Sequence, residues 1–178
     1  EEVSKKQSKL YESYHMVRGV KRYGLIVDPG AADGLQGTDD LKEYLDHTGV
    51  QAVFKRTDRT FTGIYGIPAP GLARVRYPLG LPGLDVEYEA DLIGDAGSTC
   101  PGLLPLRTMV RQKMGILCGY FENDDGLFIV RLATTPAEVR GYRVLLTDSY
   151  HYLLPTDRYG EKKIDDRQQQ NLNLLATK

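Results

Sequence analysis

The stretch from Tyr23 to Gly34 has the sequence YGLIVDPGAADG, and it carries the most informative pattern in the chain. The apolar run Gly24 to Val27 meets an aspartate, Asp28, and a Pro-Gly pair follows at once. This pattern is typical of a buried strand that stops in a turn. A carboxylate there costs several kcal/mol to bury unless it is hydrogen-bonded or shares a proton. Asp28 therefore either shapes the turn, by accepting N–H bonds from Gly30 and Ala31, or has a chemical role.

The composition indicates one ordinary globular domain. The chain has 178 residues, of which 41% are apolar, and its formal net charge of −1 does not indicate a nucleic-acid or anionic membrane partner. No apolar run approaches the roughly 20 residues of a membrane-spanning helix. Because the sequence shows no initiator Met or leader-like segment, we expect a piece of a longer polypeptide. Two cysteines, Cys100 and Cys118, are too few for a disulfide framework, which favours a reducing, cytoplasmic setting.

The local patterns predict many short strands and two short helices. Nineteen Gly and nine Pro favour turns over a helical bundle. In residues 84–93, LDVEYEADLI, apolar residues alternate with acidic ones, including Asp91, which predicts a strand with one solvated face. The other expected strands lie at 20–27, within 50–66 around a TDRT turn, and at 72–81, 116–121, 127–132 and 142–147. Helices are expected over 38–46, with Thr38 as N-cap, and over 103–114, with Gly115 as C-cap.

These elements predict a mostly-β domain over residues 20–155. A polar N-terminal extension is expected at 1–19 and a loose polar C-terminal tail at 156–178. Alternating βα units are missing from the pattern, so a doubly wound sheet is not expected. The short strands favour a small barrel or a sandwich-like core.

Several motifs together resemble the retropepsin-like aspartic proteases of retrotransposons. LIVDPGAA, around Asp28, is similar to their active-site stretch, in which apolar residues precede Asp-Thr-Gly-Ala or Asp-Ser-Gly-Ala. FTGIYG at 61–66 stands where that family carries its flap hairpin. Residues 75–95 resemble the paired strands of retrotransposon members, and 100–117 their apolar pair and short helix. LLTDSYHYLLP at 145–155 resembles a closing segment of copia-like polyproteins.

The resemblance covers residues 20–155 and implies a small closed barrel of the retropepsin type from a gag-pol polyprotein. Each chain of such a protease supplies one aspartate, here Asp28, so two chains must meet at a twofold axis. The paired carboxylates share one proton and activate a water against a peptide bond of the polyprotein substrate. Gly30 and Ala31 would shape the loop beside the substrate. The flap that closes over the extended peptide would include Phe61, Gly63 and Gly66.

Pro29 departs from the family pattern, which has Thr or Ser at that place. The family's hydroxyl braces the two active-site loops across the dimer, and proline offers neither a hydroxyl nor an N–H. Two functions therefore stay open. One is a homodimeric aspartic endopeptidase, and the other is a catalytically impaired domain that binds peptides or dimerises.

A second aspartate, Asp148, also follows an apolar strand, in LLTDSYHY. It either forms a turn or belongs to a second active-site loop that has Tyr150 where the family has Gly. Too little chain follows for a second lobe, which favours the turn. Ser149 and His151 complete the residue types of a hydrolase triad, but no nucleophile elbow accompanies them.

No cofactor or metal is expected from the sequence. The histidines, His15, His47 and His151, are scattered, and the cysteines lack C-x-x-C spacing. The basic segment KRYG at 21–24 could contact nucleic acid, but its small charge fits a solvated strand edge better, so a nucleic-acid partner is not expected for this domain.

Overall fold

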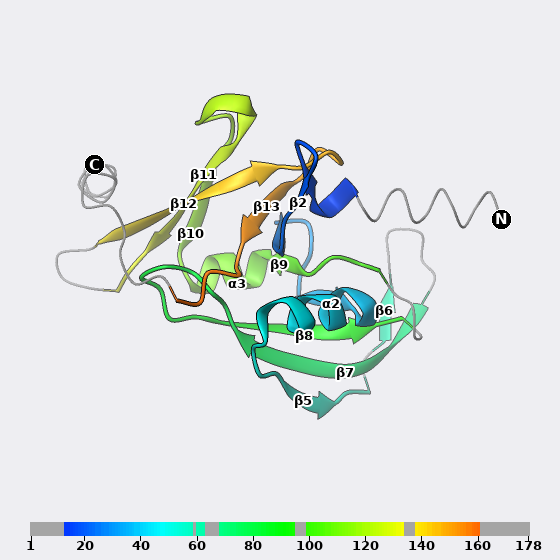
Figure 1. Ribbon diagram of the computed structural model, residues 1–178. Coiled ribbons are helices and arrows are strands. Elements are labelled where there is room, and N and C mark those ends of the chain that lie inside the picture. The colour runs from blue at the N-terminus through cyan, green and yellow to red at the C-terminus, as the bar shows by residue number, and fades with distance from the viewer. Residues whose placement is uncertain (1–12, 59, 63–67, 95–98, 134–137, 161–178) are drawn as a thin grey trace.

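The computed structural model describes residues 13–58, 60–62, 68–94, 99–133 and 138–160, in which strands dominate (Figure 1). The strands are β1 (Met16–Val17), β2 (Val20–Lys21), β3 (Gly24–Asp28), β4 (Leu35–Gly37), β5 (Val53–Arg56), β6 (Thr60–Thr62), β7 (Pro68–Pro78), β8 (Glu87–Ile93), β9 (Leu103–Pro105), β10 (Met114–Leu117), β11 (Gly126–Arg131), β12 (Val139–Leu146) and β13 (Tyr152–Pro155). The helices are α2 (Thr38–Thr48), α3 (Leu106–Arg111) and the 3-10 helix η1 (Glu122–Asp124). The mostly-β class is confirmed.

One sheet contains 11 strands, while β1 and β2 form a separate hairpin. Its order is β10-β11-β12-β13-β3-β9-β4-β8-β7-β5, and β6 pairs with β7 beside this path. Within the described residues β10 and β5 end the path without pairing to each other, and Figure 1 shows them on different sides of the molecule. The predicted closed barrel is therefore not found, because the two terminal strands do not meet.

Strand β3 lies in the middle of this sheet. Leu25 and Ile26 are buried, β13 runs antiparallel on one side with Leu153 opposite Ile26, and β9 runs parallel on the other. The predicted strand at 20–27 is divided in two, because the backbone leaves the extended pairing at Arg22 and Tyr23 before β3 begins. Because the neighbours Leu25 and Ile26 point to opposite faces of the sheet and both are buried, the strand is apolar until its last residue.

The strands predicted at 72–81 and 84–93 correspond to β7 and β8, which pair antiparallel as a hairpin. The alternation in residues 84–90 is confirmed, because Val86, Tyr88 and Ala90 are buried between exposed acidic residues. Asp91 is buried instead of solvated, and the sequence prediction is wrong for it. At this point β8 also pairs with β4, which covers its second edge, and Arg74 Nη1 donates to Asp91 Oδ2 at 2.9 Å.

The strands β5 and β6 do not pair with each other as the TDRT turn predicted. Both pair with the long strand β7 instead: Val53 of β5 lies opposite Arg76, and Thr60 of β6 lies opposite Pro70. The 11-residue strand β7 thus pairs with both β5 and β6, in place of the local hairpin that was predicted.

Helix α2 agrees with the predicted segment but begins differently. Gly37 is its N-cap, no side chain caps it, and Thr38 is its first residue. Leu41 and Tyr44 are buried, as expected for residues three positions apart on one helix face, and the first-turn residue Asp40 is buried as well.

Helix α3 is shorter than predicted. Leu103 and Leu104 belong to β9, because they pair with β3, and the helix begins at Leu106. Its C-cap is Gln112, whereas the predicted cap Gly115 lies in β10 opposite Ile129.

The packed region extends beyond residues 20–155 at both ends. His15 is buried, and so is Thr156, whose carbonyl accepts a hydrogen bond from Tyr44 Oη. Residues 156–159 therefore pack against the domain and are not the loose tail that the sequence predicted, while residues 161–178 lie outside the described part. The described residues contain no helix that has both the length and the apolar character to cross a membrane.

Candidate functional site

Asp28 ends β3 in a tight turn with a partly exposed side chain. Its Oδ1 accepts the N–H of Gly30 at 2.9 Å, and its backbone carbonyl accepts the N–H of Ala31 at 3.1 Å. The bond from Gly30 is the one that the turn interpretation predicts, whereas Ala31 binds the backbone of Asp28 and not its carboxylate. The loop therefore binds Oδ1 of the Asp28 carboxylate, while the side chain stays partly accessible to solvent.

Gly30 allows the loop to approach the carboxylate closely. A Cβ atom at this position would lie 3.1 Å from Asp28 Oδ1, a tighter spacing than side chains normally adopt. A substituted residue would therefore crowd the carboxylate and reduce its access to solvent. The role that the resemblance implies for Gly30 stays a prediction.

The turn is anchored to the strand-helix unit beside it. The N–H of Leu106, the first residue of α3, donates to Ala31 O at 3.0 Å, and Arg107 forms an ion pair with Asp33 at 3.0 Å. The loop then continues into β4, where Gly34 O accepts the N–H of Asp91. Predicted site residues Asp28, Gly30 and Ala31 therefore lie in one loop that is held at both ends.

A buried polar network lies behind the loop. Gln36 Nε2 and the N–H of Gly102 both donate to Asp40 Oδ2, at 2.7 and 3.2 Å, and Tyr77 Oη donates to Gln36 Oε1 at 2.9 Å. The network joins β4, α2, β7 and the segment that enters β9. It fixes the strands on either side of the loop relative to each other.

His15 completes this network from the N-terminal segment. Its Nε2 lies 2.7 Å from Asp40 Oδ1 and its Nδ1 lies 3.0 Å from Arg22 O. The ring of His15 is thus held from two sides, by a carboxylate oxygen of Asp40 and by the backbone carbonyl of Arg22. His15 and Asp40 are both buried, so the pair fastens residues 13–17 to the domain.

Sequence reasoning missed this network. In the sequence, Asp40 lies in the first turn of the predicted helix, where a negative charge complements the helix dipole. His15 is one of three histidines that are far apart in the sequence. One residue gave a signal: Gln36 is a polar amide in a short strand, and an amide that is buried there requires hydrogen-bond partners.

An apolar rim lies next to the Asp28 loop. Leu106 and Val110 are four residues apart on α3 and therefore share one helix face, with 48% and 68% of their surface exposed. Pro29 at the tip of the turn is also exposed. The backbone N–H of Leu106 donates to Ala31 O, so the helix that carries this face begins next to the loop.

The flap candidates have different outcomes. Phe61 belongs to β6, opposite Ala69 of β7, while Gly63 and Gly66 lie outside the described residues. The neighbouring edge strand β5 exposes Val53 and Phe54, by 56% and 54%. The assignment of a flap over Asp28 stays a prediction.

Asp148 lies in the turn between β12 and β13. It is exposed, its N–H donates to Met16 O at 2.9 Å, and the turn is closed by a bond from the N–H of Tyr150 to Thr147 O. This geometry agrees with the turn alternative. In the same turn Ser149 Oγ lies 3.0 Å from His151 Nδ1 and 2.9 Å from Thr147 Oγ1, so the hydroxyl belongs to a local turn network.

A second carboxylate, Asp125, has a different environment. It directly precedes β11 and is wholly buried. Arg18 donates to it through both Nη atoms at 3.0 Å. Arg143 Nε also donates to it, at 2.8 Å, and so does the N–H of Leu146, at 2.9 Å. Burial works to raise the pKa of Asp125, but the bonds from Arg18, Leu146 and Arg143 outweigh it and hold the pKa below its ordinary value.

The described cysteines, Cys100 and Cys118, are both free. Burial and the nearby carboxylates of Asp40 and Asp28 raise the pKa of Cys100 to about 12, so its thiol is protonated and unreactive at neutral pH. Among the described residues no group of three or more His, Cys, Asp or Glu side chains has the arrangement of a metal site.

Comparison with known proteins gives no family for this chain. No family model, no curated protein and no solved structure matches it. The function therefore has to be argued from the geometry of the Asp28 loop and its surroundings.

Proposed function

We propose that this domain is a retropepsin-like aspartic endopeptidase whose active site forms when two copies of the chain bring their Asp28 side chains together. The observation that carries the proposal is the state of Asp28. It ends a buried central strand, accepts one N–H bond within the described residues, and keeps an exposed side. A carboxylate held in this way is available to a water molecule and to a second carboxylate.

The elements around Asp28 support the same function. The apolar pair Leu103 and Leu104 runs parallel to β3 and leads directly into the short helix α3, in the order that the motif resemblance implies. Gly30 supplies an N–H to the carboxylate, and β5, which ends the sheet path among the described strands, offers an edge to an extended peptide.

One chain supplies one such loop, so the chemistry requires a second copy. The exposed face of Leu106 and Val110, on the helix whose first N–H donates to the Asp28 loop, would offer an apolar contact to the second copy. At that axis the two carboxylates share one proton. The ionised one accepts a proton from the attacking water, while the other donates its proton to the peptide carbonyl oxygen.

Pro29 favours a second candidate function, a peptide-binding or dimerisation module with little catalysis. Pro29 is exposed at the tip of the turn and has no hydroxyl or N–H to brace a partner loop. Replacing it tests this alternative. If Pro29→Thr raises the cleavage rate tenfold or more, the module is an impaired protease, and if cleavage is absent in both forms the binding function is favoured.

Casein cleavage at about pH 5 tests the protease directly, because a shared-proton dyad works in mild acid. The wild-type chain is compared with Asp28→Asn, with Asp148→Asn as matched control, since Asp148 is another strand-end aspartate with an exposed side chain. We expect pepstatin-sensitive cleavage by the wild type and by Asp148→Asn, and a loss of at least 100-fold in Asp28→Asn. Cleavage retained by Asp28→Asn would rule out the assignment.

A further inference from the structure

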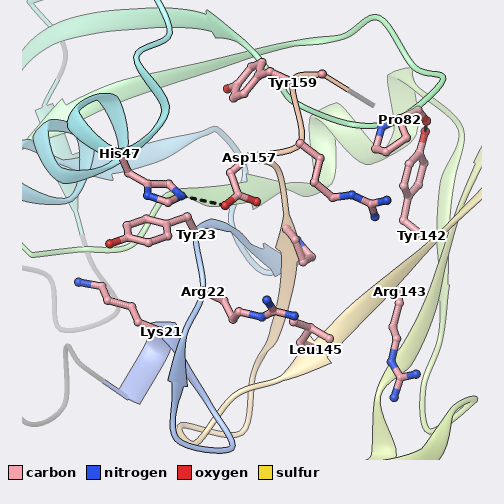
Figure 2. Close-up of a pocket in the computed structure, with 13 residues that line it drawn as sticks. Lys21, Arg22, Tyr23, His47, Pro82, Tyr142, Arg143, Leu145, Asp157 and Tyr159 are labelled. Atoms are coloured by element: carbon pink, nitrogen blue, oxygen red, sulfur yellow. Dashed lines mark hydrogen bonds and ion pairs between the residues drawn. The ribbon is translucent and has the colours of Figure 1, made fainter. Parts of the chain in front are cut away.

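A groove of about 850 Å³ opens at the end of β3 that is farthest from Asp28. Figure 2 shows it between α2, the start of β3, β12 and the segment after β13. Strand β3 separates the groove from Asp28, and five extended residues span about 16 Å. The groove is therefore a separate site, and its role is independent of the proposed protease.

Basic side chains from four separate segments line this groove. Lys21 and Arg22 come from the first hairpin, and the others are His47 of α2, Arg143 of β12 and Arg158. Asp157 is the one carboxylate among the described lining residues. Because the whole chain carries a formal charge of −1, this set is a local excess of positive charge.

Among the described residues, the acidic partners of Lys21, His47 and Arg143 do not cancel the positive charge of the groove. Asp157 is bound to His47 Nε2 at 3.0 Å. Asp125 is buried beneath the surface and shared between two guanidinium groups, those of Arg18 and Arg143, so one positive charge remains there. Glu43 pairs with Lys21.

The side chain of Arg22 is the central cation of the groove. It is exposed, and Figure 2 shows it beside Leu145, with Asp157 above it in that view. The position of Arg22 is fixed by its backbone, because its carbonyl accepts the bond from His15 and its N–H donates to His15 O.

Tyrosine rings complete the lining. Tyr23 stacks on His47 with ring centroids 3.7 Å apart and 12° between the planes, and the Lys21 ammonium lies 5.5 Å from the Tyr23 ring. Tyr142 and Tyr159 line the other sides, and their hydroxyls donate to Pro82 O and Pro78 O. These bonds hold the aromatic walls in place.

We propose that this groove binds phosphate groups of a nucleotide or of a single-stranded nucleic acid. Guanidinium groups bind phosphate oxygens in pairs, and sites for single strands combine a cationic groove with aromatic side chains, as this groove does. The segment KRYG alone carries too little charge for this partner. The fold adds Arg143 and Arg158, which lie 121 and 136 residues after Arg22, so the site is visible only in three dimensions.

Fluorescence anisotropy with a labelled ten-nucleotide single-stranded RNA tests the proposal. The full chain is titrated at about 50 and 200 mM NaCl, beside the double variant Arg22→Glu, Arg158→Glu. We expect the variant to bind at least tenfold more weakly at low salt, and the wild type to lose several-fold in affinity at the higher salt, because bound phosphates release counterions. The matched control is Arg56→Glu, an exposed arginine on β5 that does not line the groove, which should bind like the wild type.

Competitors identify the source of the phosphate. Displacement of the RNA by pyrophosphate or a mononucleotide indicates a small phosphate ligand, whereas displacement by unlabelled oligonucleotide alone indicates a strand; both support the site. Equal binding by the wild type and the double variant would overturn the proposal, as would the absence of binding. Stronger displacement by an oligoglutamate peptide would also overturn it, in favour of an acidic peptide. Unchanged melting temperatures show that the variants are folded.

Discussion

Asp28 is the last residue of the strand β3 and Asp125 directly precedes the strand β11, yet their surroundings differ. Asp125 is wholly buried and receives bonds from Arg18, Arg143 and the N–H of Leu146. Asp28 is partly exposed, and within the described part of the chain its carboxylate accepts one bond, from the N–H of Gly30. A carboxylate that is surrounded by donors holds elements together, whereas one that keeps an open side is available for chemistry.

The largest effect on stability is expected for Asp125→Asn. The substitution removes the charge that two guanidinium groups share and leaves a buried amide among donors. We expect the free energy of unfolding to fall by about 2–3 kcal/mol, a range typical of lost hydrogen bonds to charged groups. Urea denaturation at neutral pH measures it, and a loss below about 0.5 kcal/mol would show that the cluster does not hold the hairpins together.

Low pH should weaken the contribution of Asp125 to the stability of the fold. Because the pKa of folded Asp125 lies below its ordinary value of 3.8, its contribution to stability is present above that value and is lost as the pH falls through the folded pKa. The difference in stability between the wild type and Asp125→Asn should therefore shrink below about pH 4. Urea midpoints at about pH 6 and pH 3 measure the change, and a constant difference would contradict the lowered pKa.

The smallest effect is expected for Asp28→Asn. An asparagine keeps the oxygen that accepts the N–H of Gly30, and the side chain is partly exposed. The free energy of unfolding should change by about 0.5 kcal/mol or less, as for ordinary surface substitutions. A large loss of stability would mean that Asp28 is a structural carboxylate like Asp125.

The difference between the two aspartates also shows how much the sequence can predict. The pattern at Asp28 is local: an apolar run, a carboxylate and Pro-Gly predict a strand, its end and a turn. The partners of Asp125 are not local, since Arg18 lies 107 residues away. No pattern within the segment ENDDG, residues 122–126, indicates that Asp125 binds two arginines.

The same distinction explains the fold predictions. The alternation in residues 84–90 and the helical period around Leu41 and Tyr44 follow from neighbouring residues, and both are confirmed. β9 was predicted as helix, because Leu103 and Leu104 continue the helical period and only pairing with β3 makes them a strand. The pairing of β5 and β6 with β7 likewise depends on a distant partner that overrides a local turn signal.

A mixing experiment tests the central claim, that two Asp28 side chains form one active site. Wild-type chain at a fixed concentration is incubated with a tenfold excess of Asp28→Asn, refolded together, and assayed for casein cleavage. If the site is shared, most wild-type chains pair with inactive partners, and activity falls about tenfold. Activity that stays at the level of wild type refolded alone would contradict the shared site.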